Sequence, residues 1–165
     1  MIDILVNEIV KGLETDLCKG STLYSDDLID NVTTRGLSPK VPNKTISVEE
    51  ADSIPLNHDI SSQIAQTSER YTIYIKLLVK ASSEAEGKAL RRKLTRRIKH
   101  SILKKNGTIF KGILTSQDAD TGYSERPLKY AIGKTEFDMG EIENALFFLS
   151  DTTLTVDTDV NYYEA

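Results

Sequence analysis

The sequence is poor in the residues that most often carry chemistry. It has one cysteine, two histidines and no tryptophan in 165 residues. A single cysteine excludes an internal disulfide framework and suits a protein made in a reducing cytoplasm. With only two histidines beside it, a thiolate-type zinc site within one chain is excluded as well. We therefore expect Cys18 to be a buried, inert thiol.

Long apolar runs are also missing. No stretch approaches the roughly 18 apolar residues of a membrane-spanning helix, so we expect no membrane partner. The N-terminal residues carry acids where a secretory leader has Lys or Arg, so we expect no such leader. A hydrophobic fraction of 39% and a charged fraction of 28% are typical of a globular protein of one domain.

Catalytic motifs are absent from the sequence too. There is no Gly-rich phosphate loop, nucleophile elbow or dinucleotide fingerprint. Asp118 and Asp120 fit the first two ligand positions of a calcium loop. Gly122 and Tyr123 then occupy the positions where that loop needs an acid and a glycine. We predict that the protein is not an enzyme and uses no metal and no cofactor.

Two segments have helical periodicity. In residues 2–17 apolar side chains recur at steps of three and four, which predicts one amphipathic helix. Residues 84–105 place Leu90, Leu94, Ile98 and Ile102 on a narrow apolar stripe within a very basic sequence. Ser82 or Ser83 can cap this second helix at its N-terminus.

Strand-like alternation is clearest in residues 70–80, where Tyr71, Ile73, Ile75, Leu77 and Val79 share one face. Other predicted strands cover 44–49, 128–137 and 145–163, with weaker candidates at 31–35 and 108–114. Residues 25–69 otherwise look irregular, with an exposed loop at 53–69. A second polar loop is predicted at 116–127.

The order of these elements favours an α+β fold: a mostly antiparallel β-sheet with two helices packed on one face. We expect residues 1–165 to form a single domain with a long irregular region at 25–69. A doubly wound α/β fold is disfavoured, because helices and strands do not alternate regularly.

Charge is distributed very unevenly. Residues 84–105 hold nine of the twenty-one Lys and Arg residues and two acids, a net charge of +7. Since the whole chain carries −4, the remainder carries −11. Residues 136–165 contain eight acids and no Lys or Arg. The two segments therefore meet either within one fold or between copies of it.

Three interpretations of the basic helix stay open. Its cations could neutralise nucleic-acid phosphates, although the calculated pI of about 5.3 is low for a nucleic-acid-binding domain. It could be a solvated outer face. It could also meet the acidic C-terminal strands of a neighbouring copy, a contact that closes into a ring when it repeats head to tail.

The pattern of segments resembles a known family. An amphipathic N-terminal helix precedes KVPNKTISVEEADSIP and the strand YTIYIKLLVK. The helix EAEGKALRRKLTRRIKHSIL follows, and the chain ends in LTVDTDVNYYEA. This order, over nearly the whole chain, resembles the tail terminator (tail completion) proteins of long-tailed bacteriophages.

The resemblance implies a non-enzymatic α+β virion protein of the tail or neck, assembled in the host cytoplasm. Such proteins form hexameric rings that cap the tail tube, stop its polymerisation and join the tail to the head. The implied partners are other copies, the tail tube protein and head–tail connector or neck proteins. Genomic DNA passes through the ring without sequence-specific binding.

On this basis the basic helix and the acidic C-terminal strands are candidates for the subunit interface or the lumen. The candidate residues are Arg91, Arg92, Arg96, Arg97, Asp157 and Asp159. Loops near 50–68 and 115–127 are candidates for docking on the tube or connector. Two alternatives stay open: another neck (head completion) protein, and a DNA-binding protein that uses helix 84–105.

Overall fold

The structure is a computed structural model that describes residues 2–60, 64–103, 116–117 and 123–163. Its elements are α1 (Ile2–Leu17), β1 (Asn31–Thr33), β2 (Lys44–Ile60), β3 (Ile64–Ala81), α2 (Glu84–Leu103), β4 (Ser116–Gln117), β5 (Tyr123–Ile142) and β6 (Ala145–Tyr163). The strands form one six-stranded sheet in the order β1-β2-β3-β6-β5-β4. The short β1–β2 pair is parallel and the other described pairs are antiparallel. The predicted α+β fold is confirmed.

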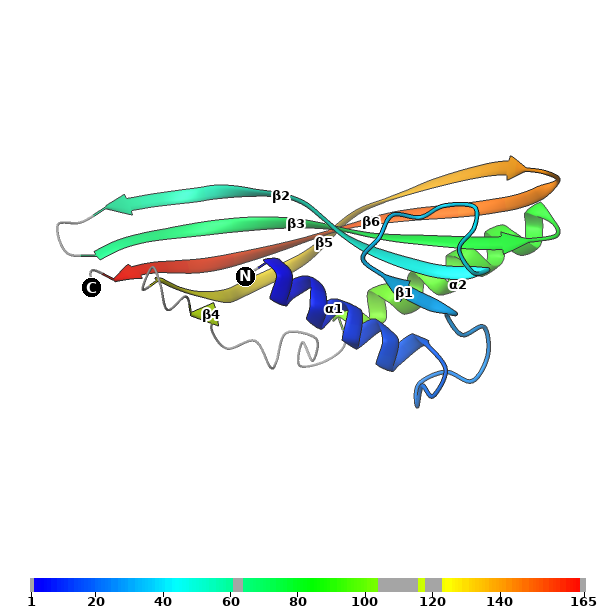
Figure 1. The fold of residues 1–165 in the computed structure, drawn as a ribbon, viewed down its shortest axis with the longest axis horizontal. Helices are drawn as coiled ribbons and strands as arrows, with labels where there is room; N and C mark the ends of the chain where they lie inside the picture. The colour runs from blue at the N-terminus through cyan, green and yellow to red at the C-terminus, as the bar shows by residue number, and fades with distance from the viewer. Residues whose placement is uncertain (1, 61–63, 104–115, 118–122, 164–165) are drawn as a thin grey trace.

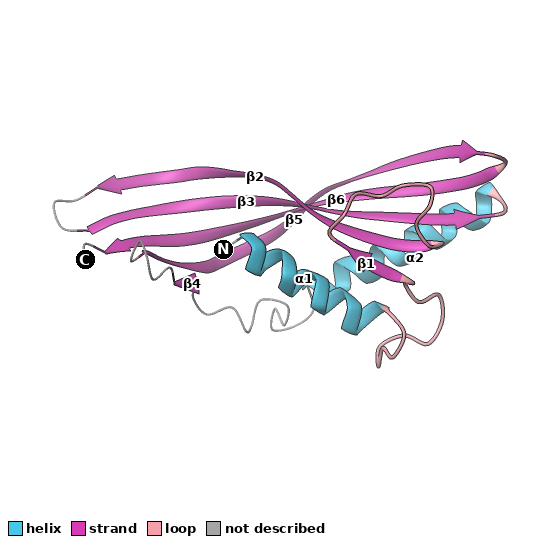
Figure 2. Ribbon diagram, in the orientation of Figure 1, coloured by secondary structure: helices cyan, strands magenta, loops and turns pink. Residues whose placement is uncertain are grey.

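Both helices pack on the same face of the sheet (Figures 1 and 2), as the sequence predicted. The apolar stripe of α1 and the stripe of α2 meet alternate residues of β3 and β6 in one core. Fully buried members of this core are Leu5, Ile9, Leu13, Leu94, Ile98, Ile102, Ile73, Ile75, Leu77, Val79, Phe148, Leu154 and Val156. The apolar residues that recur at helical spacing and those that alternate along the strands therefore lie in one apolar layer between the helices and the sheet.

Helix α2 begins as predicted and then approaches the sheet very closely. The Ser83 hydroxyl accepts a hydrogen bond from the Glu86 amide at 3.3 Å, which is an N-cap contact. One turn later, Gly87 lies directly against the ring of Phe148, and a Cβ atom there would overlap three ring carbons. Glycine is normally unfavourable inside a helix. Here it sets the spacing between α2 and β6.

The sheet extends far beyond the helices. Its four long strands twist at mid-length and continue as a projecting arm (Figure 1), which we define as residues 52–60, 64–72, 123–131 and 155–163. In Figure 1 α2 lies over the other half of the sheet, whereas the first turn of α1 reaches the base of the arm, where Ile2 lines a hollow with Ser53 and Tyr71. The N-terminus is near the middle of the molecule, and β6 ends at the tip of the arm.

The arm contradicts the predicted loop at 53–69. Most of that segment belongs to β2 and β3, which pair from Lys44 with Val79 to Ile60 with Ala65. Similarly, part of the predicted loop at 116–127 is strand, because β4 covers Ser116–Gln117 and β5 begins at Tyr123. The described parts of the candidate docking loops near 50–68 and 115–127 are thus sheet. The predicted strand at 108–114 lies outside the described residues.

Bulges explain why the alternation in β2 could not be followed through the sequence. Ile46, Val48 and Glu50 face the helices, but the register shifts between Glu50 and Asp52. After this shift Ser53 lies opposite Tyr71, so the odd-numbered residues of β2 now face the side of the sheet on which the helices lie. A bulge adds one residue to one strand and thereby reverses the apparent phase. Strand β5 has two such shifts, whereas β6 has none against β3, and the alternation of β6 was correctly predicted.

Candidate subunit interface

The basic residues of α2 that were considered for an interface fall into two groups. Those of the first group form hydrogen bonds and ion pairs with other residues of the same chain. Arg97 is only 9% exposed. Its guanidinium donates to a carboxylate oxygen and to the backbone carbonyl of Asp26, each at 2.7 Å. It also lies 4.2 Å from the ring centroid of Tyr24. Arg97 therefore fixes α2 to the loop that follows α1, and its predicted role at an outer interface is not supported by this placement.

Lys93 strengthens the same contact. Its ammonium group lies 2.6 Å from an Asp26 carboxylate oxygen and 2.8 Å from one of Asp27. Hydrogen bonds from Lys93 and Arg97 lower the pKa of Asp26 from 3.8 to about 2. We call these four residues, Asp26, Asp27, Lys93 and Arg97, the loop clamp. It holds one flank of α2 in a fixed position.

Arg91 is engaged on the opposite flank of α2. Its guanidinium lies 4.7 Å from the ring centroid of Phe137 and donates to the carbonyl of Asp138 at 2.8 Å. Burial lowers the pKa of Arg91. Arg91 thus attaches α2 to the outer strand β5. Two of the four predicted arginines consequently stabilise the position of the helix itself.

Arg92 and Arg96 make up the second group. Both are exposed, and neither forms an ion pair with any residue that the structure describes. Together with the half-buried Lys99 they lie on the side of α2 that faces away from the core stripe of Leu94 and Ile98. We call Arg92, Arg96 and Lys99 the basic face. It is the part of the predicted interface that remains available to a partner.

The two predicted acids of β6 are not exposed. Asp157 is 6% exposed, and Arg70 holds it through two hydrogen bonds at 2.7 and 3.0 Å. The hydrogen bonds from Arg70 lower the pKa of Asp157. Asp159 is 7% exposed. Because Asp157 pairs across from Arg70 while Val156 faces the core, both acids lie on the face opposite the helices. Within one chain the basic helix and these acids do not meet.

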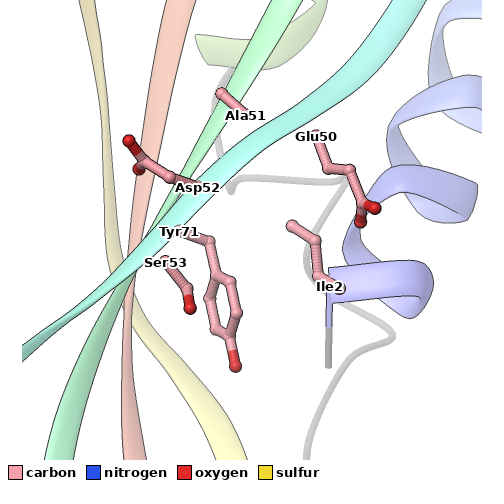
Figure 3. Close-up of a pocket in the computed structure, with 6 residues that line it drawn as sticks. All are labelled: Ile2, Glu50, Ala51, Asp52, Ser53 and Tyr71. Carbon is pink, nitrogen blue, oxygen red and sulfur yellow. The ribbon is translucent and has the colours of Figure 1, made fainter.

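A different acidic surface lies at the outer edge of β2, next to the first turns of α1. Two adjoining hollows of about 300 and 390 Å³ share Glu50. Figure 3 shows the first, where Glu50 points towards α1 and the ring of Tyr71 lies near Ile2. Asp52 lines the first hollow and Asp3 the second, and all three acids are exposed. None of the described residues that line either hollow is Lys or Arg.

We call this surface the acidic groove and define it by Asp3, Glu50, Asp52 and Tyr71. No described strand pairs with the outer edge of the β2 backbone beside it, because β1 pairs with β2 only from Thr45 to Ser47. The bulge at Ala51 turns Glu50 and Asp52 to different faces of the strand, so that carboxylates surround the edge.

A cleft on the helix-free face comes closest to an enzyme-like site. It is about 400 Å³ and contains Glu49, Glu136 and Asp151 around Lys76. Burial raises the pKa of Asp151, the nearby Lys76 opposes this, and Glu136 and Glu49 add to it. The Lys76 ammonium lies 3.0 Å from Glu49, so the cleft already contains its own counter-ion. Neither histidine nor cysteine lines it.

The described residues contain neither a metal-binding cluster nor a membrane-spanning helix. Among them, no group of three or more His, Cys, Asp or Glu side chains is placed to hold a metal ion. The described helices are also too short or too polar to cross a bilayer. The chain matches no protein-family model, and no curated protein matches it in sequence.

The acidic groove was not anticipated from the sequence, although a signal for it exists. No Lys or Arg occurs between Lys44 and Arg70, while Glu49, Glu50 and Asp52 lie close together in that interval. The sequence predicts a strand only as far as Glu49 in this interval, so it gives Glu50 and Asp52 no place in the sheet. Their relation to α1 depends on a tertiary contact between α1 and β2.

Proposed function

We propose that this protein is a tail terminator of a long-tailed bacteriophage, a structural virion protein without enzymatic activity. Copies assemble as a hexameric ring, as in the family that the sequence resembles, and this ring caps the tail tube and stops its polymerisation. The ring then joins the tail to connector or neck proteins. Genomic DNA passes through its opening without sequence-specific binding.

The observation that carries this proposal is the shape of the subunit. A helix-covered core holds a sheet whose long strands continue as an arm (Figure 1), and the outer edge of β2 is unpaired by any described strand beyond Ser47. Edges of this kind are normally covered or blocked in a protein that works alone. Together with the exposed basic face, they suit a subunit that is completed by its neighbours.

The chemistry of the described residues supports a non-enzymatic role. The carboxylates are held by arginine or lysine at the loop clamp and at Asp157. Buried hydroxyls bond to neighbouring polar groups, as Thr95 does with Ser150 at 3.0 Å. These contacts are typical of structural ion pairs and packing between layers.

Another neck or head-completion protein is the second candidate, and the same open edges and charged faces support it. A DNA-binding role for helix 84–105 has less support. Arg91, Lys93 and Arg97 are engaged within the chain, which leaves fewer cations for phosphates. The acidic groove would in addition repel a polyanion.

Tail tubes provide the direct test. Tube protein from a long-tailed phage that encodes this chain is allowed to polymerise with and without the purified protein, and tube lengths are measured by negative-stain electron microscopy. We expect shorter tubes with a ring at one end. Tubes of unchanged length and without caps would contradict the terminator function, and rings bound to connector complexes instead would favour the neck alternative.

A further inference from the structure

We propose that the basic face of one copy docks into the acidic groove of the next copy. This inference rests on the proposed ring-forming function and deepens it by naming the two surfaces that meet. The partner is a second copy of this chain, and the contact joins Arg92, Arg96 and Lys99 to Asp3, Glu50 and Asp52.

The first argument is that the basic face is positioned rigidly and has no described ion-pair partner in its own chain. Leu94 and Ile98 are 1% exposed and fix the rotation of α2 about its axis. The loop clamp on one flank and Arg91 on the other hold the helix sideways. A preorganised charged face loses little conformational entropy when it binds.

The second argument is that the acidic groove has the composition that suits arginine. Guanidinium groups pair with carboxylates through a planar set of donors and stack on aromatic rings. The groove supplies the exposed carboxylate of Glu50 on the same side of β2 as the ring of Tyr71, and the exposed carboxylate of Asp52 lies on the other side of the strand (Figure 3). Its hollow of about 300 Å³ is large enough for such a side chain.

The third argument concerns symmetry. The groove lies where α1 meets the edge of β2, whereas the basic face belongs to α2 on the side away from its core stripe. Because the two surfaces differ and carry opposite charge, the contact can repeat head to tail from copy to copy, and it produces a ring when the rotation closes. A two-fold dimer would pair each basic face with the other copy's groove and stop at two copies, so the mass of the assembled particle distinguishes it from a ring.

Charge reversal on each surface tests the proposal. The variant Arg92→Glu/Arg96→Glu presents acids to an acidic groove, and the variant Glu50→Lys/Asp52→Lys presents a basic groove to a basic face. We expect each variant alone to shift the assembly midpoint upward in protein concentration by more than about tenfold, because like charges then oppose each other across the interface. An equal mixture of the two variants restores assembly, because each altered surface now meets its opposite.

Assembly is measured by light scattering and negative-stain imaging across a concentration series of the full chain. Lys19→Glu/Lys40→Glu is the matched control for Arg92→Glu/Arg96→Glu, because it lowers the net charge by the same amount at two exposed positions outside both surfaces. This control should assemble like the wild type. Thermal unfolding checks that all variants are folded.

The possible results separate this contact from the proposed function. If the wild type forms rings and both variants do so equally well, or if the mixture fails to restore assembly, the contact is wrong while the ring function stands. If the wild type never assembles, the proposed function fails and the contact with it. Binding of wild type to duplex DNA that Arg92→Glu/Arg96→Glu abolishes, without any assembly, would assign the basic face to nucleic acid.

Discussion

Arg96 and Arg97 are adjacent in the sequence and have very different roles. Arg97 is buried against Asp26 and Tyr24, whereas Arg96 is exposed and has no described ion-pair partner. Successive helical residues are separated by about 100° around the axis, so one step moves a side chain from a packed flank to solvent. The charge of the basic segment alone could not reveal this division. The apolar stripe did reveal that Arg92 and Arg96 lie away from the core.

Gly87 provides a residue-scale prediction. We expect Gly87→Ala to lower the free energy of unfolding by about 1–3 kcal/mol, because the new methyl group would overlap the Phe148 ring. In an exposed helix the same change would raise stability by about 1 kcal/mol. Urea unfolding of both proteins measures the difference.

Gly140→Ala is the control for this comparison, because a Cβ atom there meets no other atom within 4 Å. Its stability should stay within about 0.5 kcal/mol of the wild type. A Gly87→Ala protein that is more stable than the wild type would show that α2 does not approach β6 as closely as described.

At the scale of the elements, α1, α2, residues 70–80 of β3 and the C-terminal half of β6 were predictable, because each has a regular spacing of apolar residues without interruption. The arm half of β2 was not predictable, because a bulge at Ala51 and a second shift before Asn57 break its alternation. Pro55 also argued against a strand, yet it lies in the outer part of β2, where an edge strand tolerates proline. Pairing with β3, a tertiary contact, determines that segment.

The candidate interface was predictable in part for a similar reason. The exposure of Arg92 and Arg96 follows from helical periodicity. Asp157 is buried where it accepts a hydrogen bond from Arg70, which is 87 residues away in the chain. The loop clamp depends on Asp26 and Asp27 returning to α2 from a segment without regular structure. None of these long-range pairs has a local signature in the sequence.

The loop clamp gives a prediction about pH. The pKa of Asp26 is lowered in the folded state from 3.8 to about 2, so its charge stabilises the fold above pH 3.8 and this stabilisation is lost as the pH falls towards 2. Asp26→Asn should therefore be less stable than the wild type at neutral pH. The difference between the two should shrink as the pH is lowered below about 4.

Urea unfolding at a series of pH values measures this difference. Glu141→Gln serves as the control, because Glu141 is exposed and forms no ion pair with the described residues. Its effect on the free energy of unfolding should be small. A stability difference for Asp26→Asn that stays the same from pH 7 to pH 3 would show that the clamp does not hold an ionised Asp26.

At the scale of the whole molecule, the chain combines a compact helix-covered core with a long sheet arm (Figure 1). The basic face is exposed on α2, and the acidic groove lies beside α1 and β2. Repeated contacts between unlike surfaces connect subunits in one direction. Since such contacts are partly electrostatic, assembly should weaken as salt is added.

The mass and shape of the purified protein across a concentration series test the central claim most directly. Light scattering gives the mass, and negative-stain imaging gives the shape of the particles. We expect monomers or weak oligomers at low concentration and uniform rings of about six copies with a central opening at high concentration. A compact monomer at every concentration would contradict it.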